Sequence, residues 1–291
     1  MIYLILAIVF STGVFVAMRL FERFKLDNHQ ALMWNYVAAS CTGFLMCNGM
    51  DTFSELVVEP WFGLSFLTGF WFILTYLLMT VSTQRSGVTV TSMSSKLSVV
   101  LPILVGIIFL NEKLNFEASV GIVLALVALV LVVGGRNPQQ NRVSTKGNGW
   151  IITLLPILIF FGTGLGDILM KITEQKHTGD DMSFMIAFIY FVSLIFGIII
   201  VAVEVISGRK KWQRKSMGGI ILGVINYFST YCVYNAMRCF DNVVFFPIYN
   251  IGVVCLTAFV GWLFFKEKLT VKNYIGLIIA VIAVILITFR P

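Results

Sequence analysis

The stretch "NEKLNFEASVGIVLALVALVL" at residues 111–131 occurs a second time, in altered form, as "KEKLTVKNYIGLIIAVIAVIL" at residues 266–286. The two segments align without a gap. They share Glu112, Lys113, Leu114, Gly121, Ala125, Ala128 and Leu131, which correspond to Glu267, Lys268, Leu269, Gly276, Ala280, Ala283 and Leu286. Similarity at a fixed offset indicates an internal repeat, so the chain is predicted to be a duplication.

The composition around this repeat is that of an integral membrane protein. Of 291 residues, 58% are hydrophobic and only 12% are charged. A membrane-spanning helix needs about 20 mostly apolar residues. Ten segments meet this length, at 2–20, 31–49, 62–82, 88–110, 117–135, 150–170, 183–206, 217–237, 243–264 and 271–289. The remaining connections are short, which leaves no room for a soluble catalytic or ligand-binding domain. The first span has no basic region before it and no cleavage site after it, so we expect it to remain as a helix.

The spans divide evenly between the two copies of the repeat. We predict a first five-helix repeat at 1–135, a cytoplasmic linker at 136–149 and a second five-helix repeat at 150–291. Because five is odd, the second repeat must enter the membrane upside down relative to the first. The predicted fold is therefore all-α, with ten transmembrane helices as two inverted repeats around a central cavity. This architecture is typical of secondary transporters, whose binding sites lie near the membrane midplane.

Basic residues predict the orientation of the chain. Fifteen fall on one side: Arg19, Arg23, Lys25, Arg85, Arg136, Arg142, Lys146, Arg209, Lys210, Lys211, Arg214, Lys215, Lys266, Lys268 and Lys272. The other side has Lys113, Lys171, Lys176, Arg238 and Arg290. Short loops rich in lysine and arginine stay in the cytoplasm, so both termini are expected outside a plasma membrane, the inner membrane of a bacterium. The net charge of +7 and the run "GRKKWQRK" are explained by this topology and by anionic lipid, and no nucleic-acid partner is expected.

The repeated segment also carries local structural signals. Asn115 and Thr270 can cap the helices that follow them. The small residues that begin with Gly121 and Gly276 suit close helix packing. Glu112 and Glu267 lie in the preceding turns, where a carboxylate can pair with a lysine or favour the positive end of a helix. Whether these two glutamates take part in proton coupling stays open.

Together these features resemble the ten-helix EamA-like proteins of the drug/metabolite transporter superfamily. The resemblance rests on the five-plus-five duplication, the "E-x-L" turn followed by "G-x-x-x-A" in the fifth and tenth spans, and a proline in the fourth and ninth. It implies a helical basket whose central cavity is lined by both halves, prominently by the fourth and ninth helices. It also implies carrier transport of small metabolites, often amino acids, without ATP hydrolysis. Many relatives place both termini in the cytoplasm, so the direction of transport does not follow.

The fourth span contains the clearest candidate for a binding residue. In "TSMSSKLSVVLP" (91–102), Lys96 lies about 12 Å along the helix, near the middle of the membrane. Thr89, Ser92 and Lys96 share one helical face, flanked by Ser95 and Ser98. A polar face with a cation indicates the wall of a wet cavity, and snorkelling of Lys96 to the cytoplasmic boundary is the alternative. No acidic residue is expected at its depth.

Two prolines point to the same region. Pro102 should kink the fourth span just past Lys96 and leave the Ser98 carbonyl free, and Pro247 lies in the ninth span. A packing kink is the alternative. Further polar or aromatic candidates for the cavity are Asn35, Tyr36, Trp71, Tyr76, Asn226, Tyr227, Tyr231, Tyr234, Asn235, Tyr249 and Asn250. Such a lining suits amphipathic solutes, although tyrosines near span ends can instead mark the membrane interface.

The remaining ionisable and sulfur-bearing residues suggest no chemistry. Asp167 has Lys171 four residues on and is expected to form an interfacial ion pair, and Glu204 is expected beside the basic loop 207–215. The five cysteines have no metal-ligand spacing and are expected to be small core residues. No catalytic residue, metal or cofactor is predicted.

The sequence therefore predicts a secondary carrier for a small amphipathic metabolite, an amino acid or another carboxylate, with Lys96 attracting the anion or exchanging a proton. Expected partners are this solute, the lipid bilayer and, as an open alternative, protons. The protein is expected to be a monomer or a weak homodimer. Two other functions stay open: a flippase for a lipid-linked substrate, which a lateral opening would favour, and a receptor without transport.

Overall fold

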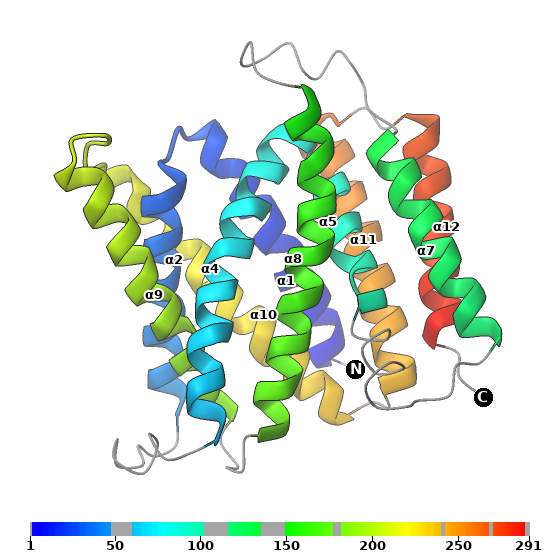
Figure 1. Cartoon of the computed structure of the whole chain (residues 1–291), viewed down its shortest axis with the longest axis horizontal. Coiled ribbons are helices and arrows are strands. Elements are labelled where there is room, and N and C mark those ends of the chain that lie inside the picture. The colour runs from blue at the N-terminus through cyan, green and yellow to red at the C-terminus, as the bar shows by residue number, and fades with distance from the viewer. Residues whose placement is uncertain are drawn as a thin grey trace.

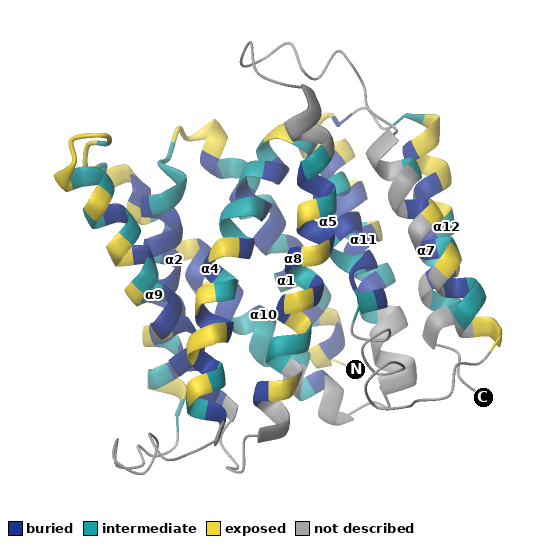
Figure 2. Cartoon of the chain, in the orientation of Figure 1, coloured by how far each residue is buried: buried dark blue, intermediate teal, exposed yellow. Residues whose placement is uncertain are grey.

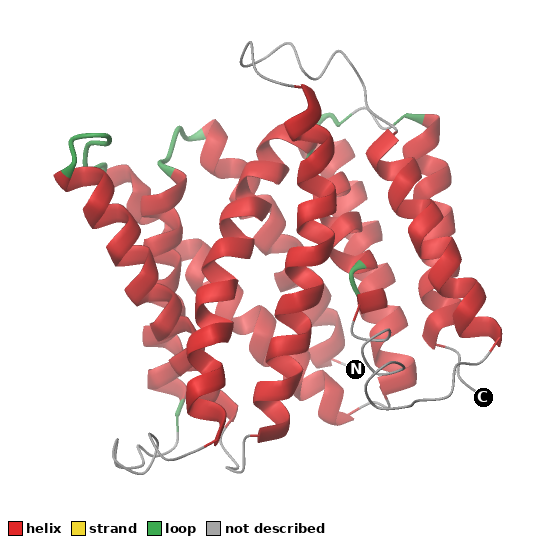
Figure 3. Ribbon diagram, in the orientation of Figure 1, coloured by secondary structure: helices red, strands yellow, loops and turns green. Residues whose placement is uncertain are grey.

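The computed structural model describes residues 2–47, 60–101, 116–134, 149–176, 182–239, 242–267 and 270–288, and within these ranges the chain forms helices and turns without a strand (Figure 3). The helices are α1 (Ile2–Arg23), α2 (Asn28–Met46), α4 (Pro60–Ser86), α5 (Val88–Leu97), α7 (Phe116–Gly134), α8 (Gly149–Lys176), α9 (Met182–Ile206), a 3₁₀ helix (Arg214–Gly218), α10 (Gly219–Cys239), α11 (Asn242–Phe265) and α12 (Val271–Thr288). Each predicted span overlaps one of them. In the described ranges, four helices are long and apolar enough to cross a membrane, and three shorter helices are apolar.

Many large apolar side chains are exposed, whereas many polar side chains are buried. Figure 2 shows where the exposed and the buried residues lie along the helices. Phe66, Phe161 and Ile199 are exposed, for example, and Thr91 has no exposed surface. A soluble protein rarely exposes so much contiguous apolar surface, so this pattern fits a molecule surrounded by lipid.

The cysteines differ in how far they are buried. Cys232 is buried, but Cys41 and Cys255 are exposed, so the prediction of core positions is wrong for these two. A thiol is apolar enough to face lipid.

The repeated segments pack against each other as α7 and α12, which lie side by side at one edge of the molecule (Figure 1). The small residues of both helices form the contact. Ala125, Ala128, Ala280 and Ala283 are buried in one cluster, and Leu97 of α5 packs into it. Side chains this small let two helix backbones approach closely, which is the main source of helix association in lipid.

Enlarging one of these alanines should therefore destabilise the protein. We expect Ala280→Leu to lower the free energy of unfolding by about 1–3 kcal/mol, because the added methylenes must push α7 and α12 apart. Thermal unfolding in detergent measures the loss. Ile278→Leu on the exposed side of α12 is the matched control and should change little. Equal melting temperatures for the two variants would contradict this packing.

The other large helix contacts also join the two predicted repeats. α2 packs on α9 and α5 on α11, while α1 lies against α10 and α4 against α8. The contact of α2 with α10 has its counterpart in that of α4 with α9. The protein core is therefore shared between the halves, and a side chain from one half can meet a side chain from the other.

A ring of charges ties the start of α2 to the loop after α9. Asp27 caps α2 by accepting hydrogen bonds from the His29 and Gln30 backbone N–H groups at 3.1 and 3.0 Å. The Lys210 ammonium lies 2.9 Å from Asp27 and 3.1 Å from Glu204, and Glu204 lies 2.8 Å from His29. Glu204 therefore does lie beside the basic loop, and it pairs with a residue of that loop.

This ring should make stability depend on pH. Burial alone would raise the pKa of Asp27, but hydrogen bonds from Lys210 and Gln30 outweigh burial and hold it below its ordinary 3.8. Burial would lower the pKa of Lys210, and hydrogen bonds with Asp27 and Glu204 raise it above 10.5. The stabilisation is therefore complete between these two values. It is lost as the pH falls through the lowered pKa of Asp27 or rises through the raised pKa of Lys210.

Lys210→Met should lower the free energy of unfolding by about 0.5–1 kcal/mol at neutral pH, since the ion pairs are partly exposed to solvent. The difference from the unmodified protein should shrink as the pH falls below about 4, because Asp27 is protonated first in the unfolded chain and, at lower pH, also in the folded protein. Melting curves from pH 3 to 8 measure it. Lys215→Met, on the same loop, is the control, and an equal loss in both variants would assign the effect to net charge.

Candidate functional site

The helix that carries Lys96 is short and ends directly after it. α5 starts at Val88, after Gly87 with a φ of 96°, and ends at Leu97. The chain then turns at Ser98, whose carbonyl accepts a hydrogen bond from the Leu101 N–H at 2.9 Å. The predicted interruption past Lys96 is therefore present. The prediction that the Ser98 carbonyl is free is wrong, because the tighter turn supplies a donor. Pro102 lies outside the described residues.

Lys96 points into the protein, toward the second half. Its ammonium donates a hydrogen bond to the Tyr249 hydroxyl at 3.0 Å and lies 4.1 Å from the centre of the Tyr249 ring. The same hydroxyl is 2.8 Å from the Ser11 hydroxyl, which is 2.8 Å from that of Ser229. These four residues come from α5, α11, α1 and α10. Lys96 is thus held by polar groups at the contact between the halves and does not snorkel.

A carboxylate lies close to this lysine. Asp167, on α8, is near enough to Lys96 to interact with it electrostatically, and it keeps exposed surface. The Ser98 hydroxyl donates to the Ser95 carbonyl. The prediction that Lys96 has no acidic neighbour was therefore wrong. The Lys171 side chain lies outside the described residues, so its pairing with Asp167 stays a prediction. The spacing of four residues along α8 gave no information on the neighbouring helix, and it is helix packing that brings Asp167 near Lys96.

Lys96 and Asp167 do not touch. The ion pairs within 4.0 Å in the described part of the chain all lie elsewhere, near the ends of α1, α2 and α9. Tyr76, on α4, interacts electrostatically with both Asp167 and Tyr249, so it borders the same space. We call Lys96, Asp167, Tyr249 and Tyr76 the central polar site.

A network of tyrosines and amides continues from this site. The Tyr76 hydroxyl donates to the Asn226 Oδ1 at 2.7 Å, and the Tyr190 hydroxyl lies 3.3 Å from the same oxygen and 2.6 Å from the Thr230 hydroxyl. Asn226 in turn donates to the Asn35 Oδ1 at 3.3 Å. The network joins α4, α10, α9 and α2, so it also crosses from one half to the other.

Two polar groups beside this network have no hydrogen-bond partner. The Asn35 amide nitrogen and the Tyr36 hydroxyl are buried without one. The Tyr36 ring lies 6.1 Å from the rings of both Tyr76 and Tyr190. A buried polar group without a partner is costly, so a solute that pairs with these atoms would gain free energy.

The serines predicted for the cavity wall contact neighbouring helices. The Ser92 hydroxyl is buried and lies 2.6 Å from that of Thr257 on α11. The Ser95 side chain is partly exposed, and its carbonyl lies 3.4 Å from the Thr163 hydroxyl. Ser92 therefore joins α5 to α11, and only Ser95 keeps accessible surface next to Lys96.

The other predicted residues are spread over three helices. Trp71 donates from its indole N–H to the Gly162 carbonyl at 2.7 Å. Tyr227 is buried and stacks on Tyr231, with ring centres 6.1 Å apart. Asn250 is buried on α11, next to Tyr249. The structure thus brings Lys96 together with Tyr249, and Tyr76 together with Asn226, but it uses Trp71 to fasten α4 to α8.

The glycines of the repeat motif and the second proline lie within helices. Gly121 and Gly276 are buried in α7 and α12, and Pro247 lies within α11. Glu112 lies outside the described residues. Glu267 is buried and reaches the start of α5 rather than that of the helix that follows it, so the predicted local role in its own hairpin is wrong.

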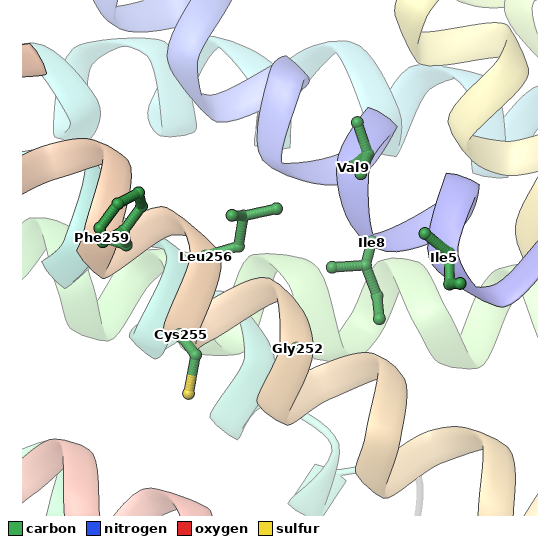
Figure 4. A pocket seen from close by; sticks show the side chains of 7 residues that line it. All are labelled: Ile5, Ile8, Val9, Gly252, Cys255, Leu256 and Phe259. Atoms are coloured by element: carbon green, nitrogen blue, oxygen red, sulfur yellow. The ribbon is translucent and has the colours of Figure 1, made fainter. Parts of the chain in front are cut away.

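A groove between α1 and α11 has a volume of about 430 Å³ and apolar walls (Figure 4). Its lining residues are Ile5, Ile8, Val9, Gly252, Cys255, Leu256 and Phe259. Several of them are exposed, so the groove opens to the apolar outer face. Ile8 also packs with Tyr249 in one cluster. The groove therefore ends close to the central polar site.

Four members of these networks were not predicted. Ser11, Ser229 and Thr230 were passed over because isolated hydroxyls in spans usually bond to their own backbone. Tyr190 stands alone in a long apolar segment. Its position about two turns inside that segment, away from both ends, was the signal that could have identified it as a cavity residue.

Comparison with known proteins agrees with the predicted family. Residues 1–134 and 149–289 match the family described as "EamA-like transporter family". The chain is also similar to an uncharacterized protein of Haemophilus influenzae. The two are 27% identical over 289 residues, which cover 97% of this chain and 95% of that protein.

Proposed function

Because the chain belongs to the EamA-like transporter family, a family of multi-pass membrane transporters, we propose that it is a secondary carrier for a small zwitterionic solute of the amino-acid class. The carrier works by alternating access in the bacterial inner membrane. Members of the family are transporters and not enzymes, which agrees with the expected lack of catalysis.

The observation that carries this proposal is the relation of Lys96 to Asp167. The two groups interact but lie beyond ion-pair distance, and the Tyr249 hydroxyl accepts a hydrogen bond from Lys96. A zwitterion placed between them would put its carboxylate against the ammonium and its ammonium against the carboxylate. Charge-assisted hydrogen bonds of this kind are among the strongest in proteins, and more so in a medium of low polarity.

The surrounding tyrosines support an amphipathic solute. Tyr36, Tyr76 and Tyr190 offer ring faces, while Asn35 and Tyr36 offer polar atoms without a partner. Ligand pockets commonly combine apolar walls with a few well-placed polar groups. The side chain of the solute would contact this part of the site, and its charged groups would contact Lys96 and Asp167.

The helix contacts support a carrier built from two inverted halves. α2 with α9, α5 with α11 and α7 with α12 each pair a helix with its equivalent. Among the other large cross-half contacts, α1 with α10 matches α4 with α8, and α2 with α10 matches α4 with α9. The two segments that match the family also correspond to the two predicted repeats. Rocking of one half against the other would expose a central site to each side in turn. By the distribution of basic residues, both termini lie outside.

A solute screen on the purified protein tests this function. Zwitterionic amino acids should raise the melting temperature, whereas their esters and their N-acetyl forms should raise it much less, because each lacks one charge. Liposomes that contain the protein should then take up the stabilising amino acid in radiolabelled form, and empty liposomes should not. If the ester and the N-acetyl form stabilise the protein as much as the amino acid does, the proposal of a zwitterionic solute is overturned. Binding without uptake would favour the receptor.

The groove between α1 and α11 supports a second candidate, a flippase for a lipid-linked substrate. Its apolar walls could hold a hydrocarbon chain while a polar head group reaches the central polar site. The test is the transfer of a fluorescent lipid between the leaflets of liposomes that contain the protein. Transfer that Gly252→Leu blocks would favour the flippase, and a rate equal to that of empty liposomes would exclude it for that lipid.

A further inference from the structure

Glu267 is held in an unusual turn at the end of α11. Lys266 has a φ of 51°, and the Glu267 N–H donates to the Gly261 carbonyl at 3.0 Å. The next helix, α12, does not need this glutamate. Thr270 caps it through a contact of 3.4 Å from the Asn273 N–H to the Thr270 hydroxyl, as predicted. The turn therefore leaves the Glu267 carboxylate available for a different helix.

That helix is α5. One carboxylate oxygen of Glu267 accepts a hydrogen bond from the Val88 N–H at 2.7 Å. The other oxygen accepts from the Thr89 N–H at 3.3 Å and from the Thr89 hydroxyl at 2.9 Å. Gly87, at the N-cap position, has no side chain that could do this. The first N–H groups of a helix lack partners within the helix and attract negative charge, so Glu267 completes the start of α5.

Two glycines from different halves make room for the carboxylate. A Cβ added to Gly87 would lie 2.8 Å from Glu267 Oε1, and one added to Gly261 would lie 2.7 Å from Glu267 Oε2. Contacts this short force atoms to shift, so any side chain at either position would displace the carboxylate. With 5% of its surface exposed, Glu267 is enclosed by residues that fit it.

We propose that Glu267 is a latch between the two halves of the protein. Glu267 comes from the second half, whereas α5 comes from the first and carries Lys96 two turns further along. A second contact, between Ser92 and Thr257, holds the same two helices together deeper in the protein. Movement of α5 away from the second half at this end must break all three bonds of the latch. The latch therefore favours the state in which the Gly87 end of α5 is closed against α11 and α12, whatever solute the protein carries.

The experiment measures this end of the molecule directly. Spin labels are placed at Arg85 and Lys272, both exposed, in a background in which the native cysteines are replaced, and the distance between the labels is determined by pulsed electron paramagnetic resonance. The protein with Glu267 should give one dominant distance. Glu267→Ala should shift a large part of the distribution to longer distances, and Gly261→Ala should do the same, because it displaces the carboxylate without removing it.

Variants with smaller expected shifts in distance, and one control, test whether the shift follows the loss of hydrogen bonds. Thr89→Val removes one of the three bonds and should give a smaller shift, and Glu267→Gln, which keeps an acceptor oxygen, should lie between Thr89→Val and Glu267→Ala. Glu117→Gln, an exposed glutamate in the first turn of α7, should leave the distances unchanged. If Glu267→Ala does not fold, the milder variants still give the graded shift. Unchanged distances in folded Glu267→Gln and Gly261→Ala would overturn the latch. This readout requires no solute, so it stands apart from the proposed function.

Discussion

Lys96→Met is expected to weaken the binding of the proposed zwitterionic solute by about 30-fold or more. The substitution keeps most of the side-chain volume and removes the ammonium that Tyr249 holds at 3.0 Å. Truncating one partner of a buried, hydrogen-bonded charge pair costs about 2–5 kcal/mol, and every 1.4 kcal/mol is about tenfold in affinity. Isothermal titration with the stabilising amino acid gives the dissociation constant, and uptake into liposomes should fall with it.

Two further variants separate charge from the hydrogen bond. Lys96→Arg retains a cation and should keep part of the affinity, whereas Tyr249→Phe retains the ring but loses the hydroxyl that Ser11 also contacts. Lys272→Met, at an exposed position of α12, controls for net charge and should bind normally. Affinity that is unchanged in Lys96→Met would remove Lys96 from the site, provided that the melting curve shows a folded protein.

Much of the fold could be predicted because lipid imposes simple rules on sequence. Every predicted span overlaps a helix. In a bilayer, a segment of about 20 apolar residues must satisfy its backbone hydrogen bonds within the protein, and a helix does so within the segment itself. The small residues of α7 and α12 could also be assigned to close packing in advance. The exception is the span at 88–110, where the helix ends at Leu97. A proline predicts such an interruption, but not how the freed carbonyl finds a new donor.

The site could be predicted only where a residue was conspicuous within its own helix. Lys96 stood out because a cation at mid-membrane is costly, and it does lie at the contact between the halves. The neighbourhood of Asp167 and Lys96 was not predicted, because helix periodicity relates neighbours on one helix and is silent about the next one. The same limit applies to Glu267, whose partners Val88 and Thr89 are far away in the sequence. Partners on other helices follow from packing, which a single sequence does not display.

Asp167→Asn is expected to weaken zwitterion binding by about 10-fold to 100-fold. A hydrogen bond to a charged group contributes about 1.5–3 kcal/mol, and the amide of asparagine keeps the shape of the carboxylate without its charge. The loss should depend on the solute. An amino acid should bind much more weakly to the variant, whereas its N-acetyl form, which has no ammonium for Asp167 to attract, should bind as well as before or better. Titration of both solutes with each variant measures this change of preference.

The double variant Lys96→Met with Asp167→Asn decides between recognition and simple charge balance. If Asp167 only balances the charge of Lys96, each single variant should lose stability, the double variant should recover it, and the preference among solutes should stay the same. If the two groups hold opposite ends of a zwitterion, the variants should differ in what they bind. Lys96→Met should then lose the carboxylate-bearing N-acetyl form and keep the amine-bearing ester, while Asp167→Asn should do the reverse. A double variant that binds neither charged form selectively, yet still folds, would place both charges in the binding site.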